Sequence, residues 1–152
     1  MYRIIALCVG LLAIPAPAES LLQQVAGAWT LTSGSEKMAD GTANELWGAG
    51  SLILDPSGHM SFFVFGKNRP PATSPDPRVP LGPMVAYYGT FTVDDDTKTL
   101  TYHVEAALSP MFNAATRMQT VALSGDTMTT TGSQVTTPQG PITPINVWKR
   151  AK

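Results

Sequence analysis

AYYGTFTVDDDTKTLTYHVEAALSP, residues 86–110, contains two alternating runs separated by a short polar stretch. Apolar or aromatic side chains recur at every second position of each run, which is the period of a β-strand. The polar stretch DDDTK, residues 94–98, suits the turn between two strands. The segment therefore predicts an antiparallel pair of strands over residues 84–94 and 99–108.

The same alternation continues through most of the chain on either side of this pair. Asp55-Pro56-Ser57-Gly58 has the residue types of a type I turn. Only residues 20–25, SLLQQV, favour a short helix. Eight short strands with closely spaced turns and no long helix predict a single all-β domain, an antiparallel barrel or sandwich. The other six strands are predicted at residues 28–36, 45–55, 59–66, 116–123, 127–133 and 143–150.

The first 18 residues have the order of a cleavable secretory signal peptide. Arg3 precedes an apolar run over residues 4–14, and Ala16-Pro17-Ala18 supplies the small residues expected before a cleavage site. The apolar run is shorter than the roughly 20 residues that span a bilayer, although an uncleaved anchor is the alternative. We expect cleavage after Ala18, a periplasmic or secreted location, and no membrane span in the mature chain.

The mature chain, residues 19–152, has the size of one domain that can bury its own core. The only cysteine of the chain, Cys8, is removed with the signal, so no disulfide is expected. Without Arg3 the chain has 9 basic and 11 acidic residues, and the basic ones are scattered. This composition gives no electrostatic footprint for nucleic acid, so no nucleic-acid partner is predicted.

One segment interrupts the strand pattern. Residues 69–83, RPPATSPDPRVPLGP, contain six prolines. Proline supplies no N–H to a sheet, so this segment is predicted to be a loop or polyproline-like. A long ordered loop in a small domain is either a lid over a site or a connection, and both interpretations stay open.

Two tryptophan motifs stand at the ends of the mature chain. Gly-Ala-Trp at 27–29 begins the first predicted strand, and Trp-Lys-Arg at 148–150 ends the last. This arrangement resembles the lipocalin and broader calycin pattern, in which the first tryptophan closes the barrel bottom and a basic residue lies over it. The resemblance implies that Arg150 stacks on Trp29, with Lys149 as the other candidate. The expected structural residues are Gly27, Trp29, Trp148 and Arg150.

The middle of the chain resembles the bacterial lipocalin-like domain family. The similar segments are LILDPSGHMSFFVFGKNRP (52–70), residues 86–110 quoted above and ALSGDTMTTT (122–131), followed by VWKR. The resemblance covers residues 21–150 in the same order. It implies a single eight-stranded antiparallel up-and-down barrel with an internal cavity, and no settled activity. The signal peptide and the longer proline-rich loop depart from the family, which puts partners of cytoplasmic relatives in doubt.

A barrel of this size can hold one small ligand, lined by alternate residues of each strand. On the fifth predicted strand the inward pair is either His103 with Glu105 or Tyr102 with Val104. The resemblance favours the first pair, because the family pattern retains histidine and glutamate at these places. An enclosed pair of this kind is hydrogen-bonded and orients a polar group of the ligand. Further candidates to line or cap the cavity are Met111, Phe112 and Met118.

The predicted ligand-binding residues combine this polar pair with aromatic and basic neighbours. They are His103, Glu105, Tyr87, Tyr88, Phe63, Phe65 and Arg117. The histidines and carboxylates show no recognised metal-ligand spacing, so neither a metal nor another cofactor is predicted. There is no nucleophile motif and no cysteine after residue 18, so no catalytic residue is assigned.

The sequence thus predicts a periplasmic or secreted lipocalin-like protein that binds a small hydrophobic or amphipathic molecule in its barrel. One alternative is a small barrel enzyme of the cyclase, isomerase or dehydratase type, with His103 and Glu105 as acid–base residues. The other is an interaction module of the cell envelope that uses residues 69–83 as its contact.

Overall fold

A computed structural model describes residues 19–71 and 82–152 of the chain. The predicted signal peptide lies outside the described residues. Residues 72–81 of the proline-rich segment also lie outside them, so the predictions that this segment is a lid or a contact surface are not addressed by the structure. The elements are α1 (Leu21–Val25), β1 (Gly27–Met38), β2 (Ala43–Leu54), β3 (His59–Gly66), β4 (Met84–Asp94), β5 (Thr99–Ala107), the 3-10 turn η1 (Pro110–Phe112), β6 (Thr116–Ser124), β7 (Thr127–Gly132), β8 (Val135–Thr137) and β9 (Gly140–Arg150).

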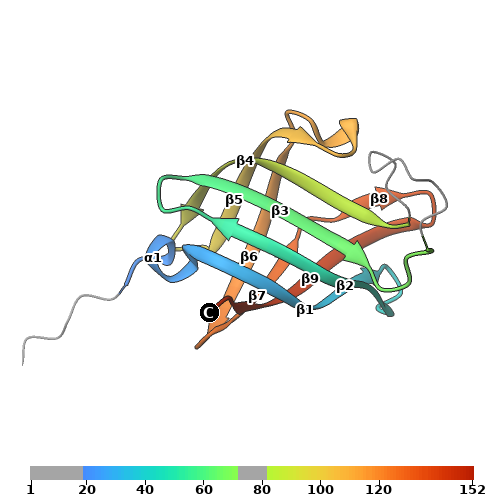
Figure 1. Cartoon of the computed structure of the whole chain (residues 1–152), viewed down its shortest axis with the longest axis horizontal. Coiled ribbons are helices and arrows are strands. Elements are labelled where there is room, and N and C mark those ends of the chain that lie inside the picture. The colour runs from blue at the N-terminus through green and yellow to red at the C-terminus, as the bar shows by residue number, and fades with distance from the viewer. Residues whose placement is uncertain (1–18, 72–81) are drawn as a thin grey trace, which may run out of the picture.

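The strands form one closed antiparallel barrel (Figure 1). Strands β1 to β7 pair in chain order, and β9 pairs with both β7 and β1, so eight strands close the ring. This confirms the predicted eight-stranded up-and-down barrel with a short N-terminal helix. The sequence did not predict β8, a three-residue strand that forms a hairpin with the beginning of β9. In the described parts of the chain, no helix is long and apolar enough to cross a membrane.

Two of the turns form as the residue types predict. In the β2–β3 turn, Gly58 has φ +95° and donates its N–H to the carbonyl oxygen of Asp55 over 2.9 Å. In the β4–β5 turn, the Asp94 carboxylate accepts hydrogen bonds from the backbone N–H groups of Asp96 and Thr97. These local bonds fix where each hairpin reverses, and hence the register of the strands that follow.

The strand alternation places the apolar core inside the barrel. The large side chains there that are completely removed from solvent include Trp29, Leu52, Leu54, Leu100, Tyr102, Met128 and Trp148. Phe62 stacks on Tyr87 with 4.7 Å between ring centroids and meets the Trp148 ring edge-on at 5.7 Å. The Trp148 indole N–H donates to the Thr130 hydroxyl, so this buried tryptophan has its polar group satisfied.

One end of the barrel is closed by α1 and the ends of β1 and β9. The Trp29 indole N–H donates to the carbonyl oxygen of Val25 over 2.8 Å, which connects the barrel floor to the helix. The Arg150 guanidinium lies 4.2 Å from the Trp29 ring centroid and donates to the carbonyl oxygens of Ala26 and Gln24. Lys149, the other candidate, is exposed on the outer face of β9.

Gly27 makes room for this stack. Its φ of +128° is a conformation that side chains rarely adopt, and a Cβ there would lie 3.1 Å from an Arg150 guanidinium nitrogen. The geometry therefore brings Gly27, Trp29 and Arg150 together in one closure.

Candidate functional site

The end of the barrel opposite α1 opens into a cavity of about 660 Å³. Its mouth lies among the end of β1, the starts of β2 and β4, η1 and the β8–β9 hairpin. Most of its walls are apolar or aromatic, contributed by Met38, Leu46, Trp47, Phe62, Val64, Pro83, Met84, Val85, Tyr87, Met111, Phe112, Val135, Pro138, Ile142 and Pro144.

Near the closed end, large inward side chains fill the interior, for example Trp29, Leu52 and Met128. Toward the open end, β1, β3 and β7 each have a buried glycine: Gly34, Gly66 and Gly132. A Cβ at these positions would lie only 2.5, 3.1 and 2.8 Å from side-chain atoms of Trp47, Pro83 and Pro144, respectively. The glycines therefore make room for three of the side chains that line the cavity.

Three polar side chains of the cavity each have a buried atom without a hydrogen-bond partner among the described residues. The Oε1 atom of Gln119 and the Oδ1 atom of Asn146 are buried and have no partner among the described residues, and both residues are only 4% exposed. The buried Nε atom of Arg117 likewise has no partner in that part of the chain. These groups come from β6 and β9 and line one cavity, so they are available to bind a ligand.

Aromatic rings hold Arg117 in place. Its guanidinium carbon lies 4.7 Å from the Phe112 ring centroid and 5.9 Å from the Tyr87 ring centroid. Phe112 belongs to η1 and Tyr87 to β4, so the cation lies between two different elements at the wall of the cavity. The contacts restrict the side chain without using the hydrogen-bonding capacity of Nε.

Burial raises the pKa of three titratable groups in and around the cavity. It raises the pKa of Tyr87 to about 12, although the nearby Arg117 guanidinium opposes this shift. Burial also raises the pKa of Tyr102 well above its ordinary value. Both tyrosines are therefore neutral hydroxyl groups at physiological pH. At the mouth, burial raises the pKa of Glu36, and a hydrogen bond from Trp47 counteracts this in part.

Of the seven predicted ligand-binding residues, the structure places two in this cavity, Tyr87 and Arg117. The prediction that His103 and Glu105 face the interior is wrong, because both are exposed while Tyr102 and Val104 are buried. The pairing of β5 with β6 determines which side chains of β5 face inward, because Tyr102 lies opposite Arg117 of β6 and both point into the barrel. An acid–base pair of His103 and Glu105 inside the cavity is thereby excluded.

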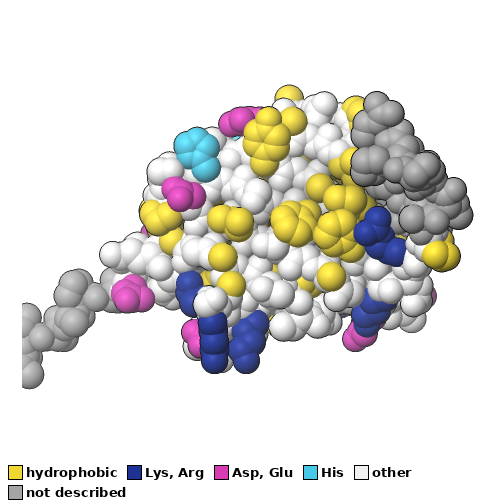
Figure 2. All heavy atoms as spheres, viewed as in Figure 1, with side chains coloured by type: hydrophobic (Ala, Val, Ile, Leu, Met, Phe, Trp, Pro, Cys, Tyr) yellow, Lys and Arg dark blue, Asp and Glu magenta, His cyan; other side chains and the backbone are white. Residues whose placement is uncertain are grey.

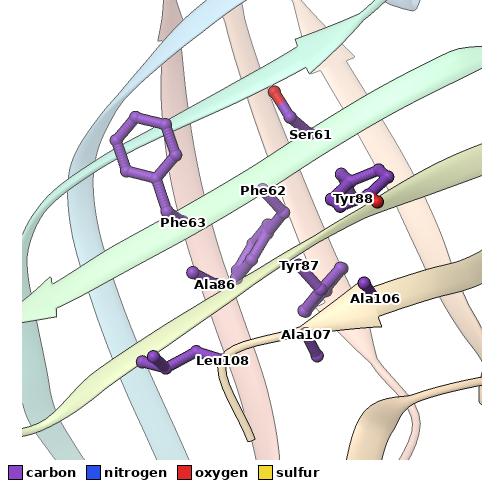
Figure 3. A pocket seen from close by; sticks show the side chains of 9 residues that line it. All are labelled: Ser61, Phe62, Phe63, Ala86, Tyr87, Tyr88, Ala106, Ala107 and Leu108. Carbon is purple, nitrogen blue, oxygen red and sulfur yellow. The ribbon is translucent and has the colours of Figure 1, made fainter. Parts of the chain in front are cut away.

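Phe63, Phe65 and Tyr88 also lie outside the barrel, not in the cavity as predicted. Phe63 and Phe65 are half-buried on the outer face of β3, and Tyr88 is 54% exposed on β4. Apolar side chains gather on this face in Figure 2. Phe63 and Tyr88 border a shallow hollow of about 380 Å³ over β3, β4 and the end of β5 (Figure 3). The aromatic residues of β3 thus cover both faces of the barrel wall.

The three further candidates divide in the same way. Met111 and Phe112 line the cavity as expected, whereas Met118 is 52% exposed on the outer face of β6. Sequence reasoning missed Gln119 and Asn146. A signal for both was present: Gln119 alternates with Arg117, and Asn146 alternates with Trp148 and Arg150. Residues two apart on a strand share a face, so these amides belong with side chains already assigned to the interior.

The comparisons with known proteins agree with this architecture. A family model described as a lipocalin-like domain matches residues 26–151, a range that contains every strand and the whole cavity lining. No curated protein matches the chain. The resemblance noted from the sequence motifs is confirmed, and the chain belongs to the lipocalin-like domain family.

Proposed function

We propose that this barrel binds a small, mostly apolar molecule bearing a polar group. The observation that carries the proposal is the cavity of about 660 Å³ at the open end. Small-molecule sites are commonly about 300–1,000 Å³, mostly apolar, and equipped with a few polar groups that fix orientation. The cavity has each of these properties.

The apolar walls supply the driving force for such binding. Removing about 200 Å² of apolar ligand surface from water contributes about 5 kcal/mol at roughly 25 cal/mol per Å². Part of that gain offsets the loss of ligand motion on association. Polar contacts then decide which apolar molecules are retained, because an apolar wall alone discriminates weakly.

Titration with the uncharged fluorescent lipophile N-phenyl-1-naphthylamine tests the proposal. We expect saturable binding that weakens at least about tenfold in Val85→Trp, since an indole at this half-buried mouth position fills part of the cavity. Ile53→Trp is the matched control, because Ile53 is 45% exposed on the outer face of β2. Native mass spectrometry of gently purified protein would reveal a retained ligand. Absence of saturable binding, or equal weakening by both variants, would contradict the proposal.

We also propose that the protein acts outside the cytoplasm, after cleavage of residues 1–18. The support is the order of a basic residue, an apolar run and the small residues Ala16 and Ala18. The expected intact mass of the exported protein corresponds to a chain that begins at Glu19. Retention of Met1 on the exported protein would contradict cleavage.

A further inference from the structure

The interior of the barrel contains a cation, Arg117, that has no counter-charge among residues 19–71 and 82–152. Arg117 points inward from β6 and its Nε atom is buried. No carboxylate of the described residues pairs with it: the ion pairs found there, Lys67–Glu45 and Arg150–Asp126, use other cations. An arginine guanidinium keeps its full positive charge in proteins. A bound anion is the simplest group that would compensate this charge.

The acidic residue of the lining does not supply that compensation. Glu36 lies on β1, which pairs with β2 and β9 and not with β6. Its carboxyl interacts with Trp47, and burial favours its neutral form. Glu36 and Arg117 both line the cavity, but no ion pair joins them among the described residues, so Arg117 is a cation that a ligand carboxylate can reach without displacing a protein carboxylate.

Two amide side chains extend this polar region. Gln119 is the next inward residue after Arg117 on β6, and residues so spaced are about 7 Å apart at Cα. Its partner on β7 is Gly132, which places no side chain beside it. Asn146 adds a second buried oxygen without a partner. A buried polar atom without a partner destabilises the empty cavity, so a ligand that satisfies these atoms recovers that cost.

We propose that the cavity selects amphipathic carboxylic acids, with the carboxylate on Arg117 and the apolar body against Phe62, Val64 and Trp47. This inference rests on the proposed cavity binding and specifies the class of ligand. A guanidinium matches a carboxylate in charge and in planar donor geometry. The amides of Gln119 and Asn146 lie within the same cavity and can accept a hydrogen bond from a hydroxyl group of such an acid. A cationic ligand would be repelled, and a fully apolar one would leave the three buried polar atoms unpaired.

The test compares two probes with the same hydrocarbon body, cis-parinaric acid and its methyl ester. For the wild-type protein we expect the acid to bind about 10- to 100-fold more tightly, which corresponds to a charge-assisted interaction. In Arg117→Met the acid should lose this advantage, while the affinity for the ester stays within about threefold. Lys149→Met is the matched control, because it removes one positive charge from the exposed outer face of β9.

Each outcome separates this inference from the proposed function. Equal binding of acid and ester by the wild-type protein would overturn the selection for acids and leave cavity binding intact. Binding of neither probe would overturn both. Equal loss of acid affinity in Arg117→Met and Lys149→Met would overturn the assignment to Arg117, because overall charge would then explain the preference. The wild-type comparison needs no variant, so it decides the question even if Arg117→Met does not fold.

Discussion

Arg150 and Arg117 lie at opposite ends of the same barrel and are used in opposite ways. Arg150 stacks on Trp29 at the closed end and donates hydrogen bonds to two backbone carbonyl oxygens. Arg117 also contacts aromatic rings, but its buried Nε atom has no partner among the described residues. Both are partly buried arginines on inward strand positions, so burial and residue type alone do not distinguish their roles.

The difference is in how completely each end satisfies its polar groups. At the closed end, the Trp29 indole and the Arg150 guanidinium are both bonded to the protein itself. At the open end, Gln119 and Asn146 are buried with oxygens that bond to nothing in the described chain. Hydrogen bonds already made within the protein stabilise the fold, whereas unmade ones in a cavity are available to a ligand.

The largest effect is expected at the closed end. Trp29→Ala should lower the free energy of unfolding by about 3–5 kcal/mol, the range for replacing a buried aromatic residue with alanine. Trp29 is completely buried, and the substitution also removes the surface on which Arg150 stacks. Urea denaturation measures this loss, with Ile53→Ala on the outer face as the control. A loss below about 1 kcal/mol would show that Trp29 does not support the closure.

The two arginines provide the next comparison. Arg150→Met should lower the free energy of unfolding by about 2 kcal/mol, because it removes two charge-assisted hydrogen bonds and a cation–π contact. Arg117→Met should change it by less than about 1 kcal/mol, because losing the contacts with Phe112 and Tyr87 is offset by relief of an unpartnered buried Nε. Chemical denaturation of both variants without ligand makes the measurement. Equal losses would contradict the division between a structural and a ligand-facing arginine.

Much of the fold was predictable because local residue types determine it. Alternation predicted the eight barrel strands, Asp55 and Gly58 predicted a turn, and the motifs around Trp29 and Trp148 predicted how the barrel closes. These signals lie within a few residues of one another or at the two ends of the chain. The short β8 carries no such signal, since three residues are too few to show alternation.

The cavity was less predictable because the inward face of a strand depends on its neighbours. On β5, Tyr102 or His103 could point inward according to local pattern alone, and pairing with Arg117 decides for Tyr102. The register also shifts between Tyr88 and Gly89, where β4 pairs with β5. Polar residues are normally expected outside a barrel, yet Arg117 and Gln119 face inward while Met118 faces solvent. Hydropathy therefore misleads where a cavity needs polar groups.

A smaller effect is expected from pH at the open end. The pKa of Glu36 is raised in the folded protein by burial, so folding favours its protonated form. Its contribution to stability is present below the unfolded-state pKa and is lost as pH rises through the raised folded-state value. Glu36→Gln should remove this decline in stability. The decline itself should be less than about 1 kcal/mol, because Glu36 is partly exposed. Denaturation midpoints from pH 4 to 7 measure it.

Glu45 is a control because its contribution to stability depends on pH in the opposite direction. A hydrogen bond from Lys67 lowers the pKa of this exposed carboxyl. Its contribution is therefore present above the unfolded-state pKa and is lost as pH falls through the lowered value. Glu45→Gln should shift the pH profile in the direction opposite to Glu36→Gln. The same direction for both variants would contradict the assignment of burial as the cause at Glu36.

The smallest effects are expected for His103→Ala and Glu105→Gln. Both side chains are exposed on the outer face of β5, so each change should alter the free energy of unfolding by no more than about 0.5 kcal/mol. Neither should change the affinity for N-phenyl-1-naphthylamine by more than about twofold. Tyr102, one position away and completely buried, is the contrasting site, and Tyr102→Ala should destabilise the protein by about 3 kcal/mol or more. A tenfold loss of probe affinity in His103→Ala would mean that the outer face, and not the cavity, binds the ligand.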